Sequence, residues 1–109
     1  MNMSEAELGR KYRLLSSYSD FIKAQENAFY YLGSNAYLFV SPVKDKKYRI
    51  YNPTMRKFVD FGQMGAEDYT KHGDMLRRNN YLKRATAIKG DWHKDPYSPN
   101  NLAIHILWQ

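Results

Sequence analysis

Apolar side chains recur at intervals of three and four residues over the first third of the chain. The series comprises Leu8, Tyr12, Leu15, Tyr18 and Ile22, and Phe29 and Leu32 extend it. This spacing is typical of a helix with one buried face. A capping-box pattern, Ser4 followed by Glu7, predicts where the helix starts. Serines and an aspartate within residues 16–20 weaken the pattern, because such side chains compete for backbone hydrogen bonds. We expect one interrupted helix or two short ones, ending near residues 33–35.

Strand patterns follow in the middle of the chain. Residues 36–41 form a continuous apolar, aromatic and β-branched run, typical of a short strand covered on both faces. Residues 47–51 and 57–61 alternate in type, and Asn52 and Pro53 between them favour a turn. This arrangement predicts a β-hairpin. We therefore expect a small antiparallel sheet of about three strands.

Helix signals return after the hairpin. We expect a short helical turn over residues 66–72 and a longer helix that Asp74 caps and that continues to about residue 87. Residues 89–98 have the composition of a loop. The Ser-Pro pair before residues 100–108 is typical of a helix start, so a last helix should dock its apolar side chains on the core. The predicted fold class is α+β, with N-terminal helix or helices, a three-stranded sheet and further helices.

Length and charge refine this organisation. At 109 residues the chain has room for one compact domain. Within it we distinguish a helical segment, residues 1–35, from a basic α+β module, residues 36–109. Residues 1–43 hold four basic and four acidic side chains, whereas residues 44–94 hold thirteen basic and six acidic ones, a net charge of +7. The positive excess of the chain therefore lies in the module.

Composition narrows the classes of function. Aromatic residues make up 16% of the chain, and ten of them are tyrosines, which suit surfaces that a partner covers. The chain has no cysteine, which excludes disulfides, thiolate metal sites and a cysteine nucleophile. No apolar run approaches the roughly 20 residues that span a bilayer. We expect a protein without a membrane span that becomes part of a larger assembly.

Candidate catalytic and metal-binding groups are sparse. The histidines His72, His93 and His105 are too dispersed for a short-range zinc pattern, and we expect surface or capping roles for them. The only acidic group that could serve a metal-dependent nuclease comprises Asp60, Glu67 and Asp68 with Lys71. Helix-start roles explain two of these carboxylates more simply. We predict a protein that is not an enzyme and that uses no metal or cofactor.

A cluster of basic and aromatic residues is the strongest binding signal. We expect the hairpin and the helix after Asp74 to form one positive face. The candidate contact residues are Lys47, Arg49, Tyr51, Arg56, Lys57, Arg77, Arg78, Tyr81, Lys83 and Arg84. Such a face can neutralise phosphates and stack on bases, or it can seal a protein interface. The alternative is a solvated charged surface over an aromatic core.

A distinctive order of motifs begins at residue 48: the tyrosine-rich hairpin, the EDYTKH run at residues 67–72, the Arg77-Arg78 and Tyr81-Leu82 pairs, Asp91-Trp92 and the closing Ile106-Leu107-Trp108. This order resembles a family of small basic proteins encoded by nucleocytoplasmic large DNA viruses. It covers about the last two thirds of the chain. The family has no assigned activity, so the resemblance implies a setting and no mechanism. That setting is the virion, or the host cytoplasm or viral factory during assembly.

Two hypotheses about function follow. The leading one is a non-enzymatic virion structural protein, a minor capsid or cement and scaffold protein whose partners are other virion proteins, capsid proteins in particular. The alternative is a nucleic-acid-binding protein that condenses DNA or regulates its use through the basic face of residues 44–94. Both hypotheses use the same side chains.

Overall fold

The structure, a computed structural model, describes residues 3–109 and confirms the α+β arrangement. Two helices come first, α1 (Glu5–Leu15) and α2 (Phe21–Leu32). An antiparallel sheet of order β1-β2-β3 follows, made of β1 (Leu38–Val40), β2 (Lys46–Asn52) and β3 (Lys57–Gln63). The remaining elements are α3 (Tyr69–His72), α4 (Met75–Thr86), the 3-10 turn η1 (Asp91–Lys94), α5 (Pro99–Leu102) and the π-helical turn η2 (Ala103–Leu107).

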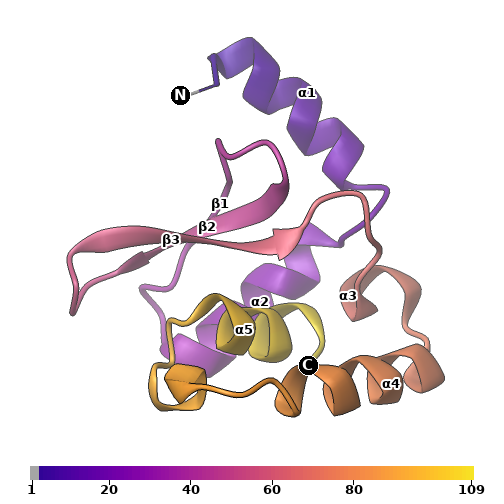
Figure 1. The fold of residues 1–109 in the computed structure, drawn as a ribbon. Coiled ribbons are helices and arrows are strands. Elements are labelled where there is room, and N and C mark those ends of the chain that lie inside the picture. The colour runs from indigo at the N-terminus through magenta and orange to yellow at the C-terminus, as the bar shows by residue number, and fades with distance from the viewer. Residues whose placement is uncertain (1–2) are drawn as a thin grey trace.

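The helices lie around the sheet in an uneven way. Figure 1 shows α2, α4 and α5 on one side of the sheet and α1 on the other, beside the β1–β2 connection. The tip of the β2–β3 hairpin projects away from the helices at the left of the view, whereas α3 and α4 lie near the opposite end of β3. The two ends of the hairpin therefore have different surroundings.

The N-terminal segment forms two helices, and the capping box predicted for the first of them is present. Ser4 and Glu7 complete the capping box of α1, and the Asp20 carboxylate accepts a hydrogen bond from the amide of Lys23 at the start of α2. The prediction that the apolar residues of this segment share one buried face was wrong, however, since Tyr12 and Ile22 are 48% and 69% exposed. The break before α2 reorients the second helix, so that its small side chains face the core. The buried residues are Lys11 and Leu15 in α1 and Ala24 and Ala28 in α2.

The hairpin is confirmed, with Ile50 paired to Val59 and Tyr51 paired to Phe58. Strand β1 is shorter than the predicted run and pairs only with β2. Its expected burial on both faces was wrong, because Phe39 is 51% exposed while Leu38 is buried. Helices cover only one face of this part of the sheet, and alternation of side chains places Phe39 on the other.

The helices after the sheet also follow their sequence signals. Asp68 caps α3, Asp74 caps α4 and Ser98 caps α5, each by accepting a backbone hydrogen bond. The predicted last helix is present, although its second half is a π-helical turn. It docks as expected on the core. The fully buried side chains of this segment are Leu102, Ile106 and Leu107.

The core lies between the covered face of the sheet and these helices. Tyr48, Ile50 and Phe61 are essentially without solvent exposure and pack in one cluster with Leu15 and the C-terminal apolar residues. Gly62 follows at a positive φ of 83°, and a side chain there would lie 2.9 Å from Leu107. The close approach of β3 to the C-terminal segment thus requires glycine at this position.

Candidate functional site

A buried ion pair joins the start of β2 to the start of α3. The Nζ atom of Lys47 lies 2.9 Å from Oδ2 of Asp68, and the two side chains are only 3% and 1% exposed. Burial lowers the pKa of Lys47, while the nearby Asp68 carboxylate acts in the opposite direction. The backbone amide of Asp68 is fixed as well, because it donates to the carbonyl oxygen of Tyr18.

Hydroxyl groups extend this pair into a buried polar network. The Thr70 hydroxyl donates to Oδ1 of Asp68 and accepts from the amide of Asp20. Ser19 lies 3.2 Å from the Thr70 hydroxyl and accepts from the Tyr48 hydroxyl at 2.8 Å. Burial raises the pKa of Tyr48, which stays a protonated donor. The network satisfies its buried polar groups and ties the α1–α2 connection, β2 and α3 together.

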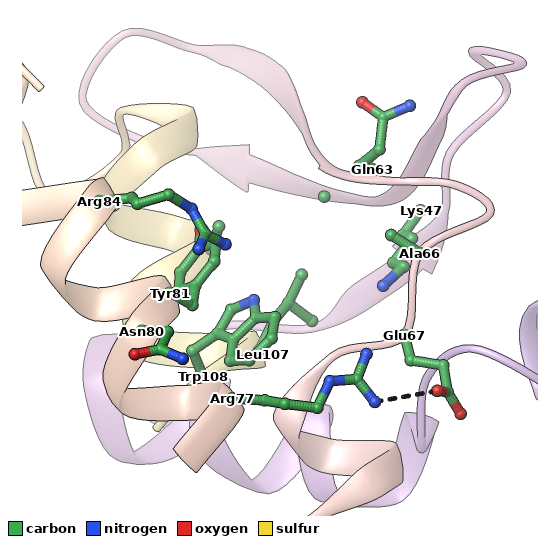
Figure 2. A pocket seen from close by; sticks show the side chains of 12 residues that line it. Lys47, Gln63, Ala66, Glu67, Arg77, Asn80, Tyr81, Arg84, Leu107 and Trp108 are labelled. Atoms are coloured by element: carbon green, nitrogen blue, oxygen red, sulfur yellow. Dashed lines mark hydrogen bonds and ion pairs between the residues drawn. The ribbon is translucent and has the colours of Figure 1, made fainter. Parts of the chain in front are cut away.

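A cleft of about 500 Å³ opens beside this network (Figure 2). It lies between the end of β3, the connection that leads to α3, the helix α4 and the C-terminal residues. Its lining residues are Lys47, Gly62, Gln63, Ala66, Glu67, Arg77, Asn80, Tyr81, Arg84, Ala103, Leu107 and Trp108. We call this site the α4 cleft. Its volume is within the range of small-ligand sites.

Hydrogen-bond donors dominate the polar lining of the α4 cleft. Arg77, Asn80 and Arg84 occupy positions at helical spacing on one face of α4. Arg77 forms a single ion pair with Glu67, at 3.2 Å, and both side chains are largely exposed. Arg84 has no ion-pair partner within residues 3–109. With the two paired cations set aside, the cleft keeps one uncompensated positive charge.

Aromatic rings form the wall of the cleft next to α4. Tyr81 and Trp108 stack with ring centroids 4.1 Å apart and planes 9° from parallel. Arg78 does not line the cleft, and its Nε atom donates to the carbonyl oxygen of Trp108 at 2.8 Å. The guanidinium of Arg78 also covers the ring of Tyr69. Arg78 therefore holds the C-terminus against α4 and is not an open contact residue.

A second surface lies on the uncovered face of the sheet. Phe39, Tyr51 and Phe58 stand there between 44% and 51% exposed. Phe58 makes edge-to-face contacts with both other rings, at centroid distances of 6.2 and 5.2 Å. Arg49 stacks over Phe58 and is bonded through two nitrogens to Asp60. We call these five residues the outer sheet face.

The charged side chains of the outer sheet face, Arg49 and Asp60, compensate each other. Burial opposes ionisation of Asp60, but hydrogen bonds from Arg49 and Ser41 outweigh it and lower the pKa of Asp60 below its ordinary value. The Arg49 charge is thereby neutralised. Beyond this pair, Arg56 and Lys57 are exposed at the hairpin tip without an ion-pair partner in the described part of the chain. Uncompensated positive charge thus lies at the hairpin tip, next to Phe58 in the sequence.

The predicted contact residues fall into two groups and do not form one face. Arg49, Tyr51, Arg56 and Lys57 belong to the outer sheet face or its tip, at one end of the hairpin. The second group lines the α4 cleft: Lys47, Arg77, Tyr81 and Arg84. Figure 1 shows α4 near the other end of the hairpin. Lys83 is exposed and outside the cleft lining. Figure 2 shows the Lys47 side chain directed toward the cleft, but the side chain itself is buried.

The sequence did not predict the roles of several site residues. Trp108 packs against the core as expected, but it also forms part of the cleft wall. Phe39 was expected to be covered and is exposed. Lys11 is 7% exposed, and its ammonium group donates to the carbonyl oxygens of Ser41, Val43 and Lys46. One signal for Lys11 was present, since it lies at helical spacing between Leu8 and Leu15. A lysine between apolar residues on one helical face indicates that its ammonium group is buried and needs hydrogen-bond acceptors there.

The histidines differ in part from the expected surface and capping roles. His72 does act at a cap, because its Nδ1 accepts from the amide of Asp74. Its Nε2, however, is buried without a hydrogen-bond partner in the part of the chain that the structure describes. His105 stacks on Tyr31 at a centroid distance of 4.3 Å. Within residues 3–109 no three acidic or histidine side chains converge in a way that could hold a metal ion.

Comparison with known proteins finds one protein family, of unknown function, that is similar to part of this chain. Residues 37–85 match a family described as a family of unknown function (DUF5754). The matched segment contains the whole sheet, α3 and all of α4 except its last residue, and it excludes α1, α2, η1, α5 and η2. No curated protein and no solved structure matches the chain. Among the described residues no helix has the length and apolar character needed to cross a membrane.

Proposed function

We propose that this chain is a non-enzymatic structural protein that docks on an acidic partner protein through its outer sheet face. The observation that supports this best is the cluster of Phe39, Tyr51 and Phe58, each about half exposed around a neutralised Arg49–Asp60 pair. Aromatic and arginine side chains with few free charges are typical of the centre of a protein interface. No residue of this cluster is needed by the core.

The cluster is rigid before any partner binds. Two edge-to-face ring contacts and the stacking of Arg49 hold the Phe58 ring, and the backbone beneath it is paired in the sheet. Ordering of flexible side chains is a main cost of association, so a pre-ordered aromatic surface binds more tightly. Docking would also remove the apolar area that the isolated chain leaves in water.

The chemistry of the partner follows from the charges around the cluster. Arg56 and Lys57 lie at the hairpin tip, directly before Phe58 in the sequence, and the chain as a whole carries a net charge of +6. A partner with an apolar depression and an acidic rim complements this pattern and would be steered toward it. The resemblance to proteins of large DNA viruses supplies the proposed setting: a minor capsid or cement protein that contacts other virion proteins.

Site-specific photocrosslinking tests this proposal in the cells or particles that contain the chain. A photoreactive phenylalanine analogue at Phe58 should crosslink to one acidic protein. The matched control is the same analogue at Tyr30, which is 85% exposed but lies on α2. Introducing Arg56→Glu and Lys57→Glu should abolish the Phe58 adduct by reversing the rim charge. An adduct with a second copy of the chain, or equal yields at the two positions, would overturn the proposal.

A second candidate function is nucleic-acid binding through the hairpin tip. Its specific support is that Arg56 and Lys57 are exposed cations without ion-pair partners in the described part of the chain. If these two side chains contact phosphates, affinity for duplex DNA should fall steeply with salt, and replacing both by glutamine should reduce the log–log slope by about 2. A flat salt dependence would eliminate this candidate.

A further inference from the structure

We propose that the α4 cleft binds the phosphate group of a small phosphate-bearing ligand. This inference concerns a different surface from the outer sheet face and does not depend on docking there. Four parts of the chain build the cleft: the end of the hairpin, the connection that leads to α3, the helix α4 and the C-terminal residues.

Several hydrogen-bond donors line the same cleft. Figure 2 shows the guanidinium of Arg84 directed from α4 toward the Gln63 and Lys47 side of the cleft, and the Asn80 amide beside Trp108. The indole nitrogen of Trp108 also borders the cleft and makes no hydrogen bond within residues 3–109. A guanidinium group with neighbouring amide and indole donors suits an oxyanion that accepts several hydrogen bonds at once.

The charge of the cleft favours an anion over a neutral ligand. Asp68 compensates Lys47 and Glu67 compensates Arg77, whereas Arg84 has no ionic partner among the described residues. The Arg77–Glu67 pair is a single contact of 3.2 Å between largely exposed side chains, and such pairs are weak. A phosphate that enters between Arg84 and Arg77 can therefore recruit the second guanidinium by displacing Glu67. An arginine that donates two parallel N–H groups binds a phosphate more strongly than one that donates a single N–H group.

The aromatic wall should give phosphate esters a higher affinity than free phosphate. The stacked Tyr81 and Trp108 rings, with Leu107, give the cleft an apolar flank beside its donors. A phosphate ester with a planar or apolar substituent can use this flank, while free phosphate uses the donors alone. The site thus recognises the phosphate, and the substituent adds affinity.

Nuclear magnetic resonance of the indole N–H groups provides a direct test. The chain contains two tryptophans. Trp108 lines the cleft, whereas the indole of Trp92 donates to the carbonyl oxygen of Ile88 and serves as an internal control. The probes are inorganic phosphate, adenosine monophosphate and adenosine. We expect phosphate and the monophosphate to shift the Trp108 signal saturably, with tighter binding of the monophosphate, and adenosine to leave it unchanged.

Variants then assign the interaction to individual side chains. Arg84→Gln should weaken binding of the monophosphate by about tenfold or more, the effect of losing a charge-assisted hydrogen bond. Arg13→Gln is the matched control, because Arg13 is an exposed arginine on α1. Glu67→Gln should tighten binding by about two- to fivefold, because it releases Arg77 from a weak pair.

Three results would overturn the proposal. The first is the absence of a saturable Trp108 shift with any phosphate probe. The second is binding of adenosine as tight as that of the monophosphate, which would leave no role for the phosphate. The third is equal loss of affinity in Arg84→Gln and Arg13→Gln, which would indicate nonspecific attraction to a basic chain. None of these results depends on the crosslinking at Phe58, so the two proposals fail separately.

Discussion

Lys47 and Asp68 lie twenty-one residues apart in the sequence and form an ion pair that is almost completely excluded from water. Lys47 belongs to β2, and Asp68 caps α3, so the pair fixes the helix start relative to the sheet. Lys47 also lines the α4 cleft. Stability and the candidate site are therefore connected through these two side chains.

Breaking this pair from one side should destabilise the fold severely. In Asp68→Asn the side chain keeps an oxygen for the Thr70 amide but leaves the buried Lys47 ammonium unpaired. We expect the free energy of unfolding to fall by about 3–5 kcal/mol, measured by urea denaturation. Arg77→Gln, which breaks the exposed pair with Glu67, should cost about 1 kcal/mol or less.

The double variant Lys47→Met with Asp68→Asn distinguishes the interaction energy of the pair from the separate contributions of the two side chains to stability. Because it removes both charges, its loss of stability should be smaller than the sum of the two single losses by about 1–3 kcal/mol. Strictly additive losses would show that the two side chains stabilise the fold independently and would contradict the role assigned to the pair.

Lys11 should be as important to α1 as an apolar core residue. Its ammonium group donates to three carbonyl oxygens of the β1–β2 connection at 2.5–2.7 Å. Lys11→Met keeps the length of the side chain but leaves these buried acceptors without a donor, so we expect a loss of about 3 kcal/mol in the free energy of unfolding. Lys23→Met, at an exposed position of α2, should change it by less than about 0.5 kcal/mol.

Gly62 and Gly65 provide a comparison in which only the packing differs. Both have positive φ, of 83° and 92°, so alanine at either position strains the backbone by a similar amount. A new Cβ atom at Gly62 would meet Leu107 at 2.9 Å, whereas nothing lies within 4 Å at Gly65. Gly62→Ala should therefore lower the midpoint of thermal unfolding further than Gly65→Ala. Equal midpoints would contradict the close approach of β3 to the C-terminal turn.

The elements that the sequence predicted well depend on local signals. The caps at Ser4, Asp74 and Ser98 satisfy amides within three residues of themselves, and the hairpin is set by alternation and a short turn. Such interactions can be recognised in a short window. The order of helices and strands therefore followed from the residues alone.

The site was harder to predict because its relationships are long-range. Lys47 meets Asp68 only after the chain has turned at Gly62 and Gly65, and α4 then packs at the end of the hairpin opposite Arg56. Net charge counted along the sequence contains no information about this geometry. The count of charges placed the cations of the hairpin tip and those of the α4 cleft on one face, although the fold separates them. It also treated the buried Lys47 as a surface residue.

His72 makes stability depend on pH in a defined direction. Burial lowers the pKa of His72 below the ordinary value of 6.5, and the nearby Arg77 lowers it further, while Asp74, Glu67 and Asp68 act in the opposite direction. The unfolded chain therefore binds a proton more readily between the lowered pKa and 6.5. Stability should fall as the pH decreases through this window, and above it His72 should contribute no pH dependence.

The neutral ring is also the form that the structure needs, because Nδ1 must accept from the amide of Asp74 at the start of α4. His72→Asn keeps an acceptor near this position but cannot titrate. Between neutral pH and about pH 5, its free energy of unfolding should decline less than that of the parent chain. The comparison is between the two proteins, since burial also lowers the pKa of His105 and adds a slope to both. Identical declines would show that His72 does not carry this part of the acid sensitivity.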